Sequence, residues 1–185
     1  ISSPSKSNWK DVISHRDDVL IEEVDFFKNF MVLGERENGL LKIRIKSWDG
    51  SKDYYLGLES KFDFENETYD ASIGSNLEYD TDVLRYNYTS LTTPYSVIDH
   101  NVLTQKEEIK KQQEVLGGKF NSKNYTSERL FATAHDGKKI PISLVRHVDT
   151  ELNKNTPILQ YGYGSYGSTI DPSFSSVRLS LLDRG

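Results

Sequence analysis

The chain has 185 residues, a formal net charge of −5 and a pI of about 5.4, so electrostatic attraction to nucleic acid or to an anionic membrane surface is not expected. It contains no cysteine, which excludes disulfides, thiolate metal sites and a cysteine nucleophile within the chain. Apolar runs are far shorter than the ~20 residues that span a bilayer. The lack of cysteine and of a signal pattern in ISSPSKSNWK favours a cytoplasmic location, with a periplasmic one as the alternative.

The first part of the chain predicts antiparallel strands. The stretches DVLIEEVDFF (18–27) and NFMVLGERE (29–37) are apolar runs separated by a turn, and Asn38-Gly39 then gives a strong hairpin signal. In LLKIRIKS (40–47) apolar residues alternate with lysine and arginine. A period of two predicts a strand with one buried face.

The strand pattern then returns further along the chain. Asp49-Gly50 marks a second turn, and strand patterns follow at 52–58, 83–90, 95–101 and 106–112. Placing Met31 over Leu84 suggests a repeat of about 53 residues. Repeats of roughly 40–50 residues with about four strands each are typical of propeller blades. An ordinary antiparallel sandwich remains the alternative at this point.

The stretch EVLGGKFNSKN (114–124) is polar and glycine-bearing, so we place a domain boundary there, with one domain over residues 1–120 and a second over 121–185. Beyond it, residues 127–147 predict a hairpin with Asp136-Gly137 at its turn. The fold class expected is mainly β in the first domain and mixed in the second.

Two more elements are expected near the end of the chain. TPILQYGYG (156–164) predicts a strand entering a glycine loop. The apolar spacing after Ser175 and Ser176 predicts a helix capped by one of these serines. The chain does not begin with methionine and stops soon after this helix, so we expect it to be a fragment of a longer protein.

The glycine loop LQYGYGSYG (159–167) invites three chemical interpretations. Its G-x-G-x-x-G spacing resembles a dinucleotide fingerprint, but Asp171-Pro172 separates it from the helix, whose N-terminus then begins too late to meet a pyrophosphate. A nucleophile elbow, G-x-S-x-G, fails because Tyr163 stands two positions before Ser165. A tyrosine held between glycines can instead aim its hydroxyl at a developing oxyanion; a packed aromatic turn is the alternative.

No complete catalytic constellation is present in the sequence. Each histidine lies among charged or turn residues without a paired carboxylate at a recognisable spacing, so solvated side chains are expected at His15, His100, His135 and His147. Metal-ligand spacings such as H-x-x-x-H are missing, and we expect no metal and no cofactor.

Longer stretches of the chain resemble the prolyl oligopeptidase family of serine peptidases, and within it the oligopeptidase B enzymes. The resemblance rests on TPYSVIDHN (93–101), NYTSERLFATAHDGKKIPISLVRH (124–147) and PILQYGYGSYGSTIDPSFSSVRLSLLDRG (157–185). It implies a partial β-propeller, its last blades, in residues 1–120. The N-terminal part of an α/β-hydrolase domain would follow in residues 121–185.

The resemblance also implies roles for two tyrosines. Tyr163 matches the family's oxyanion-hole tyrosine, and Tyr166 matches an aromatic residue that lines the substrate site. The catalytic serine, aspartate and histidine of the family are not matched by any residue of this chain. The implied whole protein cleaves short peptides after arginine or lysine, whereas the 185-residue chain is expected to be inactive alone.

Two other functions stay open from the sequence. The chain can be a non-enzymatic, β-rich protein-binding module, or a nucleotide-binding enzyme that uses the glycine loop. A part-propeller also leaves strand edges unpaired, so self-association through exposed sheet edges is expected. Short peptides are the expected substrates, and neither nucleic acid nor membrane is an expected partner.

Overall fold

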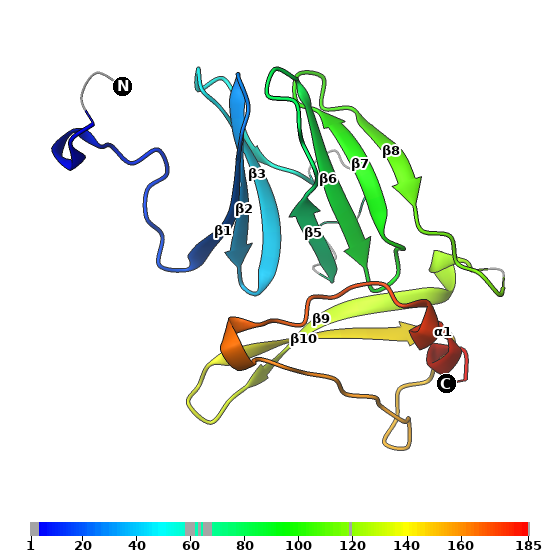
Figure 1. The fold of residues 1–185 in the computed structure, drawn as a ribbon. Helices are drawn as coiled ribbons and strands as arrows, with labels where there is room; N and C mark the ends of the chain where they lie inside the picture. The colour runs from blue at the N-terminus through cyan, green and yellow to red at the C-terminus, as the bar shows by residue number, and fades with distance from the viewer. Residues whose placement is uncertain (1–3, 58–61, 63, 65–67, 119, 185) are drawn as a thin grey trace.

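The computed structural model describes residues 4–57, 62, 64, 68–118 and 120–184, and antiparallel strands dominate this part of the chain (Figure 1). The first sheet has the order β1 (Val19–Phe26), β2 (Phe30–Glu37), β3 (Leu40–Ser47), β4 (Asp53–Tyr55). The second has the order β5 (Tyr69–Ile73), β6 (Val83–Ser90), β7 (Ser96–Asn101), β8 (Glu107–Gln112). A separate hairpin joins β9 (Tyr125–Thr133) to β10 (Lys139–His147), and α1 (Ser176–Leu182) follows.

Each four-stranded sheet is built from consecutive strands, as a propeller blade is. The strands predicted at 18–27, 29–37, 40–47, 83–90, 95–101 and 106–112 are confirmed to within one residue at either end. The strand predicted at 52–58 is shorter, as β4, and its last residue lies outside the described residues. β5 was not predicted, although Tyr69, Ala71 and Ile73 alternate with polar residues along it.

The repeat suggested by the sequence is confirmed at the level of single strands. β2 and β6 are both eight residues long, and they occupy the same second place in their sheets. Their first residues, Phe30 and Val83, are separated by the same 53 positions as Met31 and Leu84. The tight turn after β2 follows from its sequence, because Asn38 and Gly39 adopt φ values of 51° and 77°, which a two-residue hairpin of this kind requires.

The main core lies between the two sheets, which stand side by side in Figure 1. Alternation along β3 buries Ile43 and Ile45 completely, and alternation along β6 does the same for Leu84 and Tyr86. The partly polar face of β3 carries Lys42, Arg44 and Lys46, which are half-buried and ion-paired rather than simply solvated. Each Å² of apolar surface removed from water stabilises the fold by about 25 cal/mol. The packing of the two sheets against each other is therefore the principal source of stability.

The region beyond residue 120 lies across one end of both sheets (Figure 1). The Ser127 hydroxyl of β9 is hydrogen-bonded to the Thr68 hydroxyl next to β5 at 2.7 Å, and this contact is buried. Arg129 reaches the other sheet and donates from Nη2 to the carbonyl of Asn38 at 2.7 Å. The predicted hairpin and its Asp136-Gly137 turn are confirmed, with Gly137 at a φ of 84°.

The C-terminal helix is confirmed, but the strand predicted at 156–164 is wrong. The Ser175 hydroxyl accepts a hydrogen bond from the Arg178 N–H and so caps α1. Residues 157–164 have no regular secondary structure and no strand pairing, and Ile158 and Leu159 are 79% and 76% exposed. A strand needs a neighbour for its backbone groups, and none lies beside this segment in the described structure. An α/β-hydrolase fold is likewise not formed in the described part of the chain, so the assignment of 121–185 to such a domain stays a prediction.

Candidate functional site

The glycine–tyrosine segment, residues 157–167, is the candidate site that the sequence singled out. It follows the loop after β10 and ends in a single 3₁₀ turn over Ser165–Gly167. Ser165 is the first residue of this turn. Gly167 has a φ of 72°, so the turn requires the conformational freedom of glycine at that position.

Both candidate tyrosines lie at the surface. The Tyr163 side chain is 52% exposed and that of Tyr166 is 98% exposed. A Cβ added to Gly162 or Gly164 would meet no atom within 4 Å apart from the adjacent residues, so the two positions that flank Tyr163 are uncrowded. Tyr166 adopts φ 60° and ψ 28°, an unusual conformation for an aromatic residue and one that is found preferentially at functional sites.

The histidines are not brought to these tyrosines, and one expectation about them is wrong. His100 is only 4% exposed, because it lies on the inward-facing side of β7, where alternation along the strand buries it. Its Nε2 is 2.9 Å from the Tyr54 hydroxyl, and its Nδ1 is 3.6 Å from the Glu107 carboxylate. Burial raises the pKa of Tyr54 to about 12 despite a hydrogen bond with Gln105 that lowers it. His100 is therefore buried in a contact between the two sheets and is not solvated.

Other elements of a catalytic centre are not assembled in the described residues. Among the described residues, no serine hydroxyl is hydrogen-bonded to a histidine ring. Nor do three or more histidine, cysteine or acidic side chains of these residues form a group that could hold a metal ion. No helix in the described ranges combines the length and apolar character needed to cross a membrane. What the segment offers chemically is hydrogen-bond donation from a tyrosine hydroxyl.

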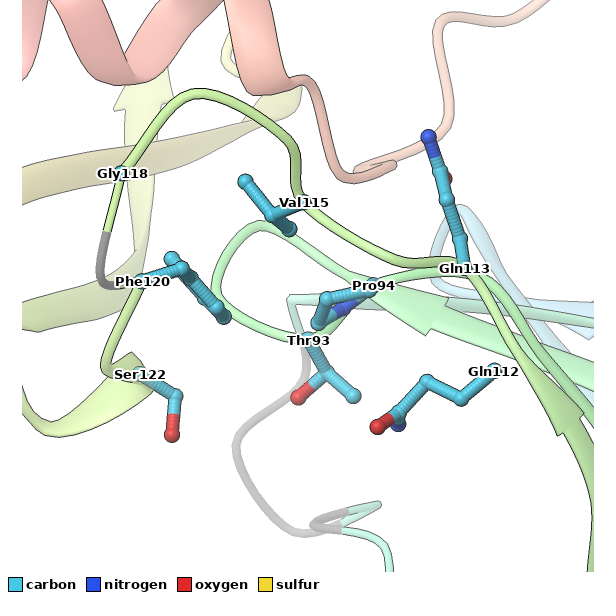
Figure 2. A pocket seen from close by; sticks show the side chains of 8 residues that line it. All are labelled: Thr93, Pro94, Gln112, Gln113, Val115, Gly118, Phe120 and Ser122. Carbon is cyan, nitrogen blue, oxygen red and sulfur yellow. The ribbon is translucent and has the colours of Figure 1, made fainter.

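A hollow of about 500 Å³ lies elsewhere, at the predicted domain boundary (Figure 2). It is lined by Thr93, Pro94, Gln112, Gln113, Val115, Gly118, Phe120 and Ser122. These residues carry amide, hydroxyl and apolar groups, none of which titrates near neutral pH. The hollow includes no residue of the glycine–tyrosine segment, so we do not assign it to the candidate site.

The sequence did not predict the ion pair that connects the region beyond residue 120 to the first sheet. Arg36 of β2 binds Asp171 through Nη1 and Oδ1 at 2.8 Å, and it binds Glu22 of β1 through Nε and Oε1 at 2.6 Å. Burial lowers the pKa of the Arg36 guanidinium, but the hydrogen bonds to Glu22 and Asp171 outweigh this, and the pKa lies above its ordinary value. Nearby, burial and the charge of Asp171 raise the pKa of Asp70.

Comparison with known proteins places the chain in a family. Residues 1–113 match the family model described as prolyl oligopeptidase, N-terminal beta-propeller domain. The chain is 44% identical over 184 residues to dipeptidyl aminopeptidase BI of Pseudoxanthomonas mexicana, covering 99% of this chain and 24% of that protein. It is 29% identical over 179 residues to protease 2 of Moraxella lacunata, covering 97% of this chain and 25% of the relative.

Solved structures agree with this match. Oligopeptidase B from Trypanosoma brucei, in a closed form with covalently bound antipain, superposes with a TM-score of 0.81 at 36% identity over 94% of this chain and 24% of that one. Oligopeptidase B from Leishmania major superposes with a TM-score of 0.82 at 33% identity over 97% of this chain and 25% of that one. The chain thus spans about a quarter of the length of the relatives it matches. On these grounds the two four-stranded sheets are propeller blades, and the chain belongs to the prolyl oligopeptidase family of peptidases.

Proposed function

We propose that this chain is part of a serine-type oligopeptidase that cleaves short peptides after arginine or lysine by way of an acyl-enzyme. The observation that carries the proposal is the half-exposed Tyr163, which stands between two glycines with open space around them, in a chain of this peptidase family. Tyr163 donates its hydroxyl proton in a hydrogen bond to the oxyanion that forms when a serine attacks the peptide carbonyl. Tyr166 lines the site where the peptide lies.

The triad serine, histidine and aspartate come from outside these 185 residues. The 185-residue chain alone therefore does not hydrolyse peptide amides. Incubation of the purified chain with a blocked arginine amide of a fluorogenic amine tests this, and turnover that follows the chain through purification would contradict it.

The lack of cysteine supports a cytoplasmic location, which fractionation of the source cells would test.

Substitution of Tyr163 in the full-length enzyme tests its role directly. Removal of one oxyanion donor typically costs about 10²–10³ in kcat. We expect Tyr163→Phe to lower kcat by about this factor with a smaller change in KM. Tyr161→Phe is the matched control, because Tyr161 is also an exposed tyrosine of the same segment, and its kcat should remain that of the wild type. Equal kcat values for Tyr163→Phe and the wild type would remove the assignment.

Specificity has a second candidate, because the relative with 44% identity is named a dipeptidyl aminopeptidase. Such an enzyme needs a free peptide N-terminus, whereas the proposed oligopeptidase accepts a blocked one. Full-length enzyme can be assayed with blocked and unblocked dipeptide amides that end in arginine. Equal cleavage of both supports the proposed function; cleavage restricted to the unblocked form supports the second candidate. A matched amide that ends in proline tests the preference for a basic residue.

The isolated chain is also proposed to self-associate through its sheets. β1 and β8 are edge strands, and the exposed apolar side chains on and beside β1 include Leu20, Val24, Phe26 and Trp48. Unpaired edges and apolar surface favour pairing between copies. Sedimentation velocity over a wide range of concentration should show association that increases with concentration. A single monomeric species across that range would contradict this proposal. The proposal would also be contradicted if the chain bound a different protein and did not associate with itself.

A further inference from the structure

Residues 168–174, which we call the strap, run from the 3₁₀ turn of the glycine–tyrosine segment toward α1. The strap is held to both blades. Asp171 accepts hydrogen bonds from Arg36 of the first sheet, at 2.8 Å from Nη1 to Oδ1 and 3.3 Å from Nη2 to Oδ2. The backbone N–H of Phe174 donates to Oγ1 of Thr89 in the second sheet at 3.1 Å.

The two anchoring residues hold equivalent positions in the repeat. Arg36 is the seventh residue of β2, and Thr89 is the seventh residue of β6. Each lies at the end of the second strand of its blade. The strap is thus attached at the same place in two consecutive blades, through contacts three residues apart along its own chain.

Both anchors are themselves well fixed. The Arg36 side chain is only 15% exposed, and its guanidinium also donates to Glu22 and to the Gly39 carbonyl, so all of its hydrogen-bonding edges are used. Thr89 is 5% exposed, although strand alternation would have placed it on the outer face of β6. A bidentate arginine–carboxylate contact restricts orientation as well as distance. The strap is therefore attached to rigid points.

Among the described residues, the glycine–tyrosine segment has no such attachment. In the described structure, no hydrogen bond joins residues 157–164 to either blade, and no described strand pairs with them. Asp171 is the first residue after Tyr163 that bonds a blade, and it also accepts a hydrogen bond from the Thr169 hydroxyl at 3.3 Å. The downstream end of the segment is consequently positioned through the strap.

We propose that Arg36, Asp171 and Thr89 are positioning residues for the Tyr163 hydroxyl, through the strap that they hold against two blades. This rests on the proposed function of Tyr163 as an oxyanion donor. The role differs from that of a stabilising ion pair, because it predicts an effect on kcat that depends on Tyr163. A displacement of about 1 Å at a reacting group can cost up to about 10²-fold in rate.

The test uses full-length enzyme and a blocked arginine amide as substrate. Asp171→Asn should lower kcat about tenfold with little change in KM. Asp99→Asn is the matched control, because Asp99 makes the same kind of two-point contact with Arg85, at 2.7 and 2.8 Å, away from the strap. Its kcat should stay at the wild-type value. Equal losses in Asp171→Asn and Asp99→Asn would overturn the proposal, as would an unchanged kcat in Asp171→Asn.

A double variant separates positioning from general stability. If Asp171 acts through Tyr163, then Asp171→Asn should have almost no further effect on kcat in a Tyr163→Phe background. A full additional tenfold loss there would overturn the proposal. If Tyr163→Phe alone leaves kcat unchanged, the proposed function of Tyr163 fails instead.

Amide hydrogen exchange of the same full-length variants gives a readout that does not depend on catalysis. Asp171→Asn and Thr89→Val should each speed exchange in residues 165–174 by at least about threefold, and Asp99→Asn should leave it unchanged. Unaltered exchange of residues 165–174 in both Asp171→Asn and Thr89→Val would contradict the attachment of the strap to the blades.

Discussion

The two blades and the region beyond residue 120 contain strands of similar sequence, but their apolar side chains differ in burial. Ile43 and Ile45 in β3 are completely buried, whereas Ile140 and Ile142 in β10 are 50% and 44% exposed. Both pairs of isoleucines alternate with other residues in well-paired strands. The comparison shows that hydrogen-bond pairing alone does not bury a strand. Burial requires a second layer, which each blade finds in the other and which the described residues do not provide for the turn end of the β9–β10 hairpin.

The largest expected effect tests this difference with a leucine from each region. Leu84 is completely buried in β6, whereas Leu130 in β9 is 44% exposed. We expect Leu84→Ala to lower the free energy of unfolding by about 2–5 kcal/mol, because it removes buried contacts and leaves a cavity. Leu130→Ala should cost less than about 1 kcal/mol. Urea unfolding of the two variants measures both values, and equal losses would break the comparison.

A smaller effect is expected at a buried carboxylate of the first blade. Glu35 is 1% exposed and binds Arg16 at 2.6 Å and the Tyr55 hydroxyl at 2.5 Å. Glu35→Gln should lower the free energy of unfolding by about 2 kcal/mol, since it weakens hydrogen bonds to a charged group. Glu108→Gln is the control, because the exposed Glu108–Lys110 pair contributes little. Similar unfolding curves for both variants at pH 7 would contradict this expectation.

The pH dependence of the Glu35 effect follows from its pKa. Burial raises the pKa of Glu35, but the hydrogen bonds from Arg16 and Tyr55 outweigh burial and hold the pKa below its ordinary value. The stability contributed by ionised Glu35 is therefore present above the unfolded-state pKa of about 4.3 and is lost as the pH falls through the lower folded-state pKa. Unfolding free energies of wild type and Glu35→Gln should converge in acid. A constant difference between pH 7 and pH 2 would contradict this.

The smallest expected effect is a gain, at the junction between the second blade and the strap. Burial raises the pKa of Asp70, and the neighbouring Asp171 raises it further, whereas Arg36 lowers it. Because the folded-state pKa is raised, ionised Asp70 reduces stability as the pH rises from the unfolded-state value of about 3.9. Asp70→Asn should raise the unfolding free energy at pH 7 by up to about 1 kcal/mol and should have less effect at pH 3. Thermal unfolding at both pH values measures it, and a loss at pH 7 would refute this sign.

Much of the blade architecture could be predicted from the sequence because its signals are local. Period-two alternation and the Asn38-Gly39 turn predicted the strands of the β2–β3 hairpin, and the offset between Met31 and Leu84 predicted the repeat. β5 has a similar alternation but is only five residues long, and it was missed. The strand expected at 156–164 was wrong because an apolar run with β-forming residues still needs a pairing partner.

The candidate site was only partly accessible to this reasoning. The glycine–tyrosine pattern and a family resemblance led to Tyr163 and Tyr166, and their roles remain predictions. His100 was expected to be solvated because its sequence neighbours include Asp99 and Asn101, yet alternation along β7 turns it inward. Applying the strand period to polar residues as well as apolar ones would have indicated its burial.

What the sequence by itself determined is most of the blade strands, the turns at Asn38-Gly39 and Asp136-Gly137 and the 53-residue repeat, because side-chain alternation and hairpin turns depend on near neighbours. Only the tertiary structure decided that Arg36 and Asp171, 135 positions apart, form an ion pair and that Thr89 turns toward the strap. Contacts of this kind depend on how two blades and a third region meet in space. A one-dimensional pattern carries no record of that arrangement, because charged residues with similar local surroundings occur throughout the chain.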